Sequence, residues 1–447
     1  MHKRIDSPAF NLVSHARAIL QSTAVILAMA AFSVQNLEAQ TFSVLHYFSG
    51  GNDGADPIAG LTIGGAGTFY GTTSGGGGAY KAGVVFQLTQ KAASWVLSPL
   101  YVFPSQQHDG YGPSAGVVIG PNGHLYGTTQ AGGSSFYGTV FELAPPPTVC
   151  RSVDCHWNET VLHSFTGPDG STPGQGNLLF DQTGNMYDTT EWGGANAVGI
   201  VYELSPSGGN WTEQVLYNFA GTPDGSNRDG ANPYGGLISD SAGDLYGTTS
   251  RGGSGSCVWI CGTVFELSPS AGGWSETILH NFEYGDNGGV VPVSTLLMDP
   301  QGNLYGTDGG NDEPEAGVFE VSPAGGGWSY SIINTLGACG GYYGGYYAGL
   351  TMDADGNFYG VCASGPPGFQ RTQYGFVFKL TFNGIWTLTD LHDFTGSDGA
   401  FPTGPVVLDS SGNLFGTASQ GGIGACEGSE ANGCGVIWEI AGVGVRN

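Results

Sequence analysis

The chain has 447 residues, including 81 glycines, with 12% aromatic and only 11% charged residues. Its formal net charge is −26 and no basic cluster follows Arg17, which argues against nucleic acid or anionic lipid as a partner. An apolar content of 40% is enough for a buried core and excludes a disordered chain. Neutral glycans, cationic partners and divalent cations stay open as ligands, and the acidic surface also serves solubility.

The N-terminus has the features of an export signal. Basic residues, among them Lys3 and Arg4, precede an apolar run over residues 18–34, and Ala39 is a suitable cleavage position. An uncleaved membrane anchor is the alternative, because the run is close to the shortest length that spans a bilayer. We expect residues 1–39 to be a signal peptide and residues 40–447 to form a mature protein that is secreted, periplasmic or on the cell surface.

One sequence unit recurs seven times after this leader. Its anchor is Tyr-Gly-Thr-Thr or a close variant, at intervals of 54 to 61 residues, beginning at Tyr70, Tyr126, Tyr187, Tyr246, Tyr305, Tyr359 and Phe415. Each unit holds four runs of apolar, aromatic and β-branched residues separated by Gly, Asp, Asn and Pro, which is typical of four strands joined by turns. The repeat predicts an all-β fold, a single seven-bladed β-propeller with four antiparallel strands per blade.

The mature chain begins and ends inside a unit. Residues 42–48 match the run that follows the Trp of other units, and residues 435–440 match the run before that Trp. We therefore expect the N-terminal strand to complete the C-terminal blade and close the ring. In the fourth unit, the phase puts run 237–240 innermost, the Leu-Tyr-Gly run second, the Val-Phe-Glu-Leu run third and run 274–282 outermost.

This strand order brings two sets of loops to one face of the disc. One set carries the pattern Asp-Gly, and the other consists of Gly-rich hairpins between the second and third runs. Eight cysteines without a Cys-x-x-Cys spacing favour disulfides in an oxidising compartment over a zinc site. The expected disulfides are Cys150–Cys155, Cys257–Cys261, Cys339–Cys362 and Cys426–Cys434.

The repeated unit, with its Val-Leu-His-x-Phe, Asp-Gly-x-x-Pro, Gly-Asn-Leu-Tyr-Gly-Thr-Thr and Gly-Thr-Val-Phe-Glu-Leu segments, resembles the GloVer tandem repeat of exported bacterial proteins. The resemblance runs from about residue 42 to residue 440, and the unit around residues 340–362 departs from it most. It implies a bacterial secreted or surface protein, and it supplies no catalytic residue.

Residues that recur in most units are interpreted as packing, because a single active site does not need copies of itself. Examples are the histidines His46, His163, His280 and His392 and the tryptophans Trp211, Trp274, Trp328 and Trp386. The hydroxyl groups of Tyr-Gly-Thr-Thr are expected to form hydrogen bonds between blades.

The acidic loops supply the candidate metal ligands, which are Asp53, Asp169, Asp224, Asp229 and Asp398. Such a ring of carboxylates would bind Ca²⁺ or a sugar. Calcium needs six to eight oxygen ligands, whereas each loop offers one or two carboxylates, so the favoured interpretation is that each Asp caps its own turn. No cofactor is expected, and Ca²⁺ is the alternative.

Residues that break the repeat are the candidate ligand-binding residues, namely Tyr342, Tyr343, Tyr346, Arg228, Arg251 and Arg371. Aromatic faces stack on sugar rings and Arg pairs with carboxylates, so this set indicates a glycan or uronate site.

The sequence holds no nucleophile elbow, zinc helix motif or P-loop, and no catalytic residue is predicted. It favours an exported, monomeric, non-catalytic binding or adhesion module for a glycan or an extracellular protein. The alternative is a carbohydrate-active hydrolase or lyase that uses a carboxylate pair on the same face. A carboxylate pair near Tyr343 or Arg371 would favour the enzyme, and an axial channel lined only by repeat-equivalent residues would favour the module.

Overall fold

A computed structural model describes residues 40–447, apart from 66, 105–108, 148–155, 221–228, 254–260, 284–288, 310–315, 337–348, 364–373, 425, 427–432 and 445–447. The chain divides into two compact units, Met1–Gln40 and Thr41–Asn447, and the second holds every strand of the described residues. Among these residues no helix is long and apolar enough to cross a membrane.

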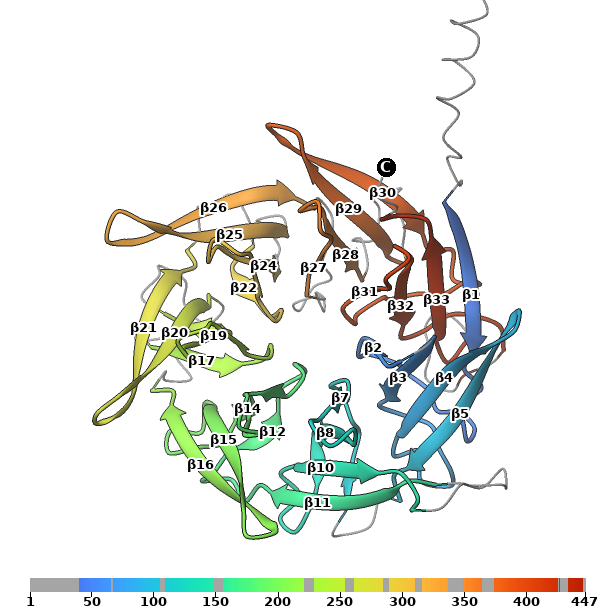
Figure 1. Cartoon of the computed structure of the whole chain (residues 1–447), viewed down its shortest axis with the longest axis horizontal. Helices are drawn as coiled ribbons and strands as arrows, with labels where there is room; N and C mark the ends of the chain where they lie inside the picture. Colours follow the sequence, from blue (N-terminus) through green and yellow to red (C-terminus); the bar gives the residue numbers. More distant parts are fainter. Residues whose placement is uncertain are drawn as a thin grey trace, which may run out of the picture. The chain divides into compact units, whose positions relative to one another are not determined.

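Seven small antiparallel sheets are arranged around one axis, so Thr41–Asn447 is the predicted seven-bladed β-propeller (Figure 1). Blade 1 consists of β2 (Thr62–Ile63), β3 (Thr68–Thr73), β4 (Val84–Lys91) and β5 (Ser94–Val102). Blade 2 consists of β7 (Val118–Ile119), β8 (Leu125–Thr129), β10 (Thr139–Ala144) and β11 (Asn158–Ser164), with a ribbon of β6 (Gly110–Tyr111) and β9 (Ala131–Gly132). Blade 3 consists of β12 (Ser171–Pro173), β13 (Leu179–Phe180), β14 (Met186–Trp192), β15 (Ile200–Ser207) and β16 (Asn210–Asn218).

The remaining blades follow the same plan. Blade 4 consists of β17 (Gly230–Pro233), β18 (Ile238–Ser239), β19 (Leu245–Gly252), β20 (Thr263–Ser270) and β21 (Gly273–Asn281). Blade 5 consists of β22 (Val291–Pro292), β23 (Leu297–Met298), β24 (Leu304–Gly309), β25 (Gly317–Ala324) and β26 (Gly327–Thr335). Blade 6 consists of β27 (Thr351–Met352), β28 (Phe358–Cys362), β29 (Phe376–Phe382) and β30 (Trp386–Asp393). Blade 7 consists of β31 (Val407–Leu408), β32 (Leu414–Ala418), β33 (Val436–Ala441) and β1 (Thr41–Tyr47).

The order of strands within a blade is the predicted one. In blade 4, β18 pairs with β19, β19 with β20, and β20 with β21, which is the outermost strand (Figure 1). The sharp turn between the first two strands is built by Asp-x-x-Gly-Asn. In blade 5, for example, Asp299 Oδ1 accepts the backbone N–H groups of Gln301 and Asn303, and Gly302 has a φ of 84°.

The ring is closed by the N-terminal strand, as predicted. Strand β1 pairs antiparallel with β33, from Thr41 opposite Ala441 to Tyr47 opposite Val436. On the next junction, Thr417 Oγ1 donates a hydrogen bond to the Ala59 carbonyl at 2.8 Å, which links blade 7 to blade 1. Both contacts join the two ends of the described chain, and the pairing of β1 with β33 removes two open sheet edges.

Two contacts explain the Tyr-Gly-Thr-Thr anchor: a Phe ring of the third strand that packs on the glycine, and a hydrogen bond from the first threonine to the next blade. A Cβ atom added to Gly247 would lie 2.6 Å from Phe265 Cζ, because the Phe ring of the third strand covers the glycine. The first threonine confirms the expected bond between blades: Thr72 Oγ1 donates to the Ala115 carbonyl at 2.8 Å and Thr248 Oγ1 to the Ser294 carbonyl at 3.2 Å.

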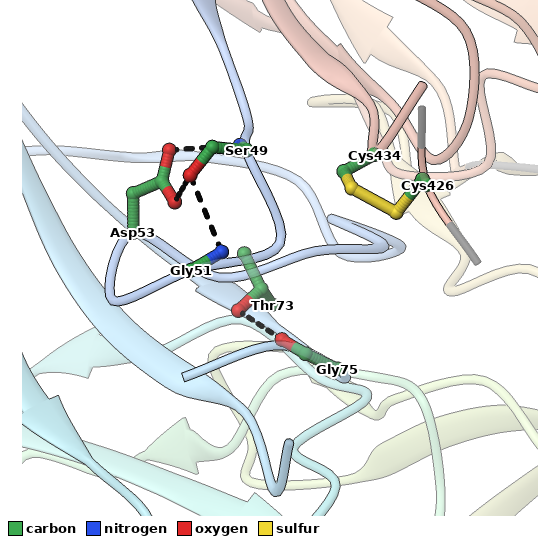
Figure 2. Close-up of a disulfide and its surroundings, with 7 residues drawn as sticks. All are labelled: Ser49, Gly51, Asp53, Thr73, Gly75, Cys426 and Cys434. Atoms are coloured by element: carbon green, nitrogen blue, oxygen red, sulfur yellow. Dashed lines mark hydrogen bonds between the residues drawn. A yellow bond between two sulfur atoms is a disulfide. The ribbon is translucent and has the colours of Figure 1, made fainter. Parts of the chain in front are cut away.

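The disulfide Cys426–Cys434 joins the two sides of the hairpin between β32 and β33, which confirms that pairing (Figure 2). A Cβ atom on Gly50 would lie 2.9 Å from Cys434 Sγ, so the bridge also packs against the loop after β1. Cys261 and Cys362 are disulfide-bonded as well, and their expected partners, like the pair Cys150–Cys155, lie outside the described residues.

Blade 3 departs from the anchor because Asp188 replaces the glycine and Tyr202 replaces the covering Phe. The two residues are opposite each other in the pairing of β14 with β15, and both are fully buried. No side chain donates a hydrogen bond to Asp188, the Tyr202 hydroxyl has no partner, and a contact of Asp188 with the Thr189 backbone is too long or bent to satisfy the carboxylate fully. Burial raises the pKa of Asp188 well above its ordinary value.

We predict that Asp188→Asn stabilises the protein at pH 7 by about 1–3 kcal/mol but not at pH 4. Because the pKa of Asp188 is raised in the folded state, the unfolded chain loses this proton at a lower pH than the folded protein does. The wild type therefore loses stability as pH rises above the unfolded pKa, near 4. Denaturant unfolding at both pH values measures this. Gly247→Asp is the control and should destabilise, since it meets the Phe265 ring, whereas equal pH profiles for Asp188→Asn and wild type would contradict the prediction.

Candidate functional site

Two sets of loops meet on one face of the propeller, which we call the loop face. It comprises the loops from the outermost strand of one blade to the next blade and the hairpins between second and third strands. The sets are hydrogen-bonded to each other: β6 pairs with β9, Ala55 bridges Gly75, and Ala400 bridges Gln420. The predicted shared face is therefore present, and the Gly-rich hairpins lie directly against the Asp-Gly loops.

The aspartates of the Asp-Gly loops cap their own turns. Asp169 Oδ1 accepts the backbone N–H of Thr166 at 2.7 Å and its hydroxyl at 2.8 Å. Thr395 makes the same two bonds to Asp398, at 2.8 and 2.9 Å. Ser49 bonds Asp53 through its backbone N–H and its hydroxyl (Figure 2). These bonds agree with the capping interpretation of the loops.

The second carboxylate oxygen of each loop faces the repeated histidine of the outermost strand. The distance from His Nε2 to Asp Oδ2 is 3.2 Å for His46–Asp53, 3.1 Å for His392–Asp398 and 3.3 Å for His163–Asp169. Burial opposes ionisation of Asp53, but the hydrogen bonds from His46 and Ser49 outweigh it and lower its pKa. The structure therefore places these three carboxylates beside outermost strands.

The axis of the propeller holds a cavity of about 270 Å³ that none of these aspartates lines. Its walls are repeat-equivalent segments that precede the innermost strands of the blades. The polar side chains among them are Ser114, Gln175, Asn177, Tyr234, Ser294, Thr295 and Thr403. In the described part of the chain no Asp, Glu, His, Lys or Arg lines the cavity, so its walls offer hydrogen bonds but no carboxylate or imidazole for acid–base chemistry.

Exposed aromatic side chains gather on the loop face. Of the described residues, Tyr80, Phe136, Tyr137 and Trp192 are 38% to 69% exposed, and all four belong to the hairpins between second and third strands of blades 1 to 3. The positive φ of Phe136 is shared by Lys81 and Ala197 at the equivalent positions of blades 1 and 3, so it belongs to the repeat. Tyr137 has an equivalent in Tyr374 of blade 6, and each ring packs beside the glycine of the adjacent loop, Gly167 or Gly396. Tyr80, Phe136 and Trp192 have no aromatic counterpart at the same position among the described residues, which marks them as candidates for ligand contact.

Arg251 is the one predicted ligand-binding residue that the structure describes. Its guanidinium carbon lies 5.9 Å from the centre of the Trp192 ring, so the pair spans blades 3 and 4. Burial raises the pKa of the neighbouring Glu191, and the charge of Arg251 opposes that shift. Of the other predicted positions, Tyr342, Tyr343, Tyr346, Arg228, Arg371 and Asp224 lie outside the described residues.

Three glutamates that sequence reasoning missed lie at consecutive blade junctions. Glu159, Glu213 and Glu276 each stand two residues after a Trp on the outermost strand, and that repeated Trp-x-Glu was the available signal. Each has one buried carboxylate oxygen without a hydrogen-bond partner.

Each of these glutamates is close to the Asp-Gly loop of the preceding blade. Burial and the charge of Asp109 raise the pKa of Glu159 to about 7, and burial and Asp169 do the same for Glu213. At the third junction the Tyr217 hydroxyl lies 3.0 Å from both Asp229 Oδ2 and Glu276 Oε2.

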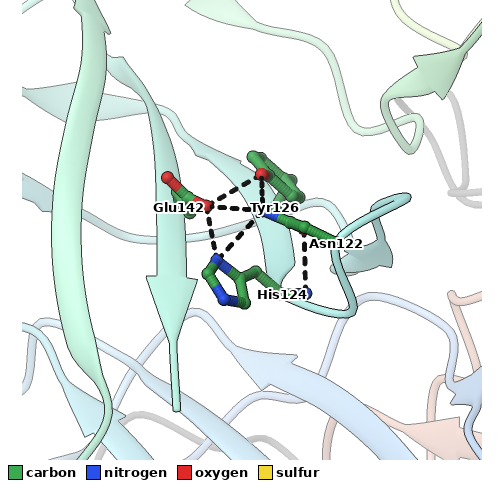
Figure 3. A network of polar contacts seen from close by, with 4 residues as sticks. All are labelled: Asn122, His124, Tyr126 and Glu142. Carbon is green, nitrogen blue, oxygen red and sulfur yellow. Dashed lines mark hydrogen bonds and ion pairs between the residues drawn. The ribbon is translucent and has the colours of Figure 1, made fainter. Parts of the chain in front are cut away.

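A polar network on the first turn of blade 2 replaces the aspartate that other blades carry there (Figure 3). His124 Nδ1 lies 2.6 Å from Glu142 Oε1, and the Tyr126 hydroxyl donates to the same oxygen at 2.8 Å. Burial would raise the pKa of Glu142, but hydrogen bonds from His124, Tyr126 and Asn122 outweigh it and lower the pKa. Since Tyr187 and Tyr305 bond to Asp181 and Asp299 of their own turns, we interpret this network as structural.

Comparisons with known proteins identify the repeat and the fold. The sequence profile described as Gloeobacter/Verrucomicrobia repeat matches residues 29–159 and 151–367. No curated protein matches the chain in sequence.

Among solved structures, a PL25 ulvan lyase bound to a GlcA(1-4)Rha3S unit has a TM-score of 0.51 at 10% identity, covering 88% of this chain and 95% of its own. The same kind of lyase without that ligand has a TM-score of 0.50 at 10% identity, covering 89% of this chain and 95% of its own. An aldose sugar dehydrogenase from Streptomyces coelicolor in its PQQ-bound form has a TM-score of 0.43 at 14% identity, covering 76% of this chain and 97% of its own. At these identities the likeness concerns the fold alone.

We predict that Glu159→Gln raises the free energy of unfolding at pH 8 by roughly 2 kcal/mol and leaves it unchanged near pH 4. The folded pKa of about 7 exceeds the unfolded value of 4.5, so the wild type loses stability as pH rises through that interval. Denaturant unfolding from pH 4 to 8 measures the effect.

Glu142→Gln is the matched control with the opposite sign. In the wild type, the folded pKa of Glu142 lies below its unfolded pKa, so the ionised side chain stabilises the fold at pH values above the unfolded pKa. That contribution disappears as pH falls, so Glu142→Gln should lose stability at neutral pH. If both variants followed the wild-type pH profile, the assigned environments of the two glutamates would be wrong.

Proposed function

The chain belongs to the Gloeobacter/Verrucomicrobia repeat family, and from this premise we propose that it is an exported, non-catalytic binding module whose loop face recognises a glycan. A propeller is a scaffold that serves many functions, so the proposal rests on side chains of the loop face. A protein partner on the cell surface is the other outcome that the test below distinguishes.

The observation that carries the proposal is the aromatic group on consecutive blades. Tyr80, Phe136, Tyr137 and Trp192 expose flat apolar surface on one face, although burying such surface is worth about 25 cal/mol per Å². The faces of pyranose rings are apolar and stack on aromatic rings, while their hydroxyl groups stay in water. An extended glycan therefore matches aromatic side chains spaced over neighbouring blades.

Arg251 indicates which glycans fit best. Its planar guanidinium group is paired with Trp192 and can form two parallel hydrogen bonds with a carboxylate or sulfate group. In a chain with a net charge of −26, a cation in this position favours an acidic sugar at the Trp192 site. We therefore expect uronate-containing glycans to bind more tightly than neutral ones.

The axial cavity supports binding over catalysis. Its described walls carry amide and hydroxyl groups on repeat-equivalent segments and no carboxylate or imidazole. Blade 3 contributes Gln175 and Asn177, which suit hydroxyl groups of a neutral sugar.

A carbohydrate-active hydrolase or lyase is the second candidate, and the carboxylates at the blade junctions favour it. Asp229 and Glu276 both lie within hydrogen-bond distance of the Tyr217 hydroxyl. A pair of carboxyl groups is what most glycoside hydrolases use as acid and base or nucleophile. The unpaired oxygens of these two residues are buried, however, so a sugar reaches them only after the junction opens. Because these oxygens are closed off from a sugar, the binding module is the better-supported function.

We predict that the purified protein binds acidic glycans on an array saturably and without cleavage, with and without calcium. Trp192→Ala should weaken binding tenfold or more, and Arg251→Ala should remove the preference for acidic over neutral glycans. Phe382→Ala, an exposed aromatic residue at the end of β29, is the control and should bind like the wild type.

The remaining outcomes decide between the alternatives. Release of unsaturated or reducing ends from a bound glycan would establish the enzyme and overturn the module. Absence of glycan binding in every condition would reject the glycan and leave an extracellular protein as the partner. Loss of binding with chelator would place Ca²⁺ in the interaction.

A further inference from the structure

We infer that His163, Asp169 and Glu213 form a binding site for a divalent transition-metal ion across the junction of blades 2 and 3. His163 comes from the outermost strand β11, Asp169 from the loop that follows it, and Glu213 from the outermost strand β16 of the next blade. The site would join two blades that otherwise meet through packing and hydrogen bonds. It is independent of the glycan proposal.

The distances fit one small ion. One ligand atom from each residue lies within 4.8 Å of the other two, and His163 Nε2 is 3.3 Å from Asp169 Oδ2. In a tetrahedral zinc site with bonds of 2.0–2.2 Å, ligand atoms are about 3.4 Å apart. The three groups therefore need only small side-chain movements to bind the ion, and in the described part of the chain they are the one such group of three or more.

Two of the atoms that would bind the ion are buried and lack a hydrogen-bond partner. They are His163 Nε2 and Glu213 Oε1. Buried polar atoms without a partner are unfavourable, and charged ones more so, which a bound ion would relieve. Asp169 is held in place through Oδ1 by Thr166, and its Oδ2 faces His163 Nε2 at 3.3 Å, the two atoms that the metal would join. A ligand carboxylate fixed by neighbouring hydrogen bonds is the usual outer shell of a metal site.

The repeat provides an internal comparison. At the equivalent position of other junctions, His46 and His392 each make a hydrogen bond to the loop aspartate, at 3.2 and 3.1 Å. The residue that corresponds to Glu213 is Leu97 in blade 1 and Phe42 in blade 7, and the Phe42 ring stacks on His392 at 3.5 Å. His163, which faces a glutamate, has the longest of the three distances to its aspartate, at 3.3 Å. The glutamate therefore distinguishes this junction from those of His46 and His392.

The charges and donor types select the class of metal. A neutral imidazole nitrogen is the commonest protein ligand of such metals. Two carboxylates and one imidazole, all deprotonated when they bind, balance the charge of a divalent cation. One nitrogen and two carboxylate oxygens suit Zn²⁺, Co²⁺ or Mn²⁺ better than Ca²⁺, which requires six to eight oxygens. His163 and Asp169 side chains are 18% and 22% exposed, so water can complete the coordination.

The test is titration of the purified, metal-free protein with Zn²⁺ by calorimetry and with Co²⁺ by visible absorption. We expect one equivalent to bind to this site, with d–d bands for Co²⁺ and a rise in the unfolding temperature with Zn²⁺. Glu213→Leu and His163→Tyr should each weaken binding at least about 100-fold. Both replacements are residues that other blades carry at these positions, which favours correct folding.

Matched controls separate this site from adventitious binding. His392→Tyr alters a His–Asp pair without a glutamate, and Glu276→Gln alters a junction glutamate that faces Tyr217 instead of a histidine. Both should keep wild-type affinity and the Co²⁺ spectrum. The proposal is overturned if no stoichiometric metal binds, or if Glu213→Leu and His163→Tyr, folded as judged by circular dichroism, bind like the wild type.

Discussion

A ring of antiparallel sheets is complete only when its two ends meet, because an open sheet edge leaves a row of backbone N–H and C=O groups unpaired. Here the pairing of β1 with β33 provides that closure, and the Thr417 bond to Ala59 holds the adjacent junction. Each blade contributes one layer to two neighbouring cores, so no blade can bury its apolar faces alone. The loops, the axial cavity and the junction sites all depend on this closure for their positions.

Within the closed ring, the repeated residues serve packing between equivalent neighbours. A Phe ring covers the anchor glycine, a threonine hydroxyl reaches the next blade, and Tyr126 meets Trp211 of that blade at 6.3 Å between ring centres. These contacts fix the backbone so firmly that the hairpins of the loop face can vary. Ligand recognition is therefore expected where the repeat is broken, as it is at Trp192 and Arg251.

The outermost strands show how one geometric position takes on different chemistry. The residue at the position of Glu213 in one blade faces the His or Tyr near the end of the outermost strand of the preceding blade. The facing pairs are Phe42 with His392, Tyr330 with His280, Glu213 with His163 and Glu276 with Tyr217. The first two pairs are stacked rings, whereas in the last two a carboxylate faces an imidazole or a hydroxyl group. A small exchange of residues thus converts a packing contact into a polar site while the backbone stays the same.

The sequence by itself determined the seven blades, the order of strands, the closing strand and the common face of the loops. It could do so because the spacing of Tyr-Gly-Thr-Thr, the alternation of strand residues and the turn residues are local properties that repeat along the chain. The Cys426–Cys434 bridge and the capping role of Asp169 were likewise within reach, since both involve neighbours in sequence.

The tertiary structure alone decided which residues from different blades meet. Glu213 lies 50 residues after His163 in the sequence, and neither residue is unusual for its strand, yet ring closure puts them on the two sides of one junction. The same holds for Trp192 and Arg251, whose contact depends on the angle between two blades. Such contacts are set by the packing of whole sheets, and packing leaves no periodic trace in the sequence of either partner.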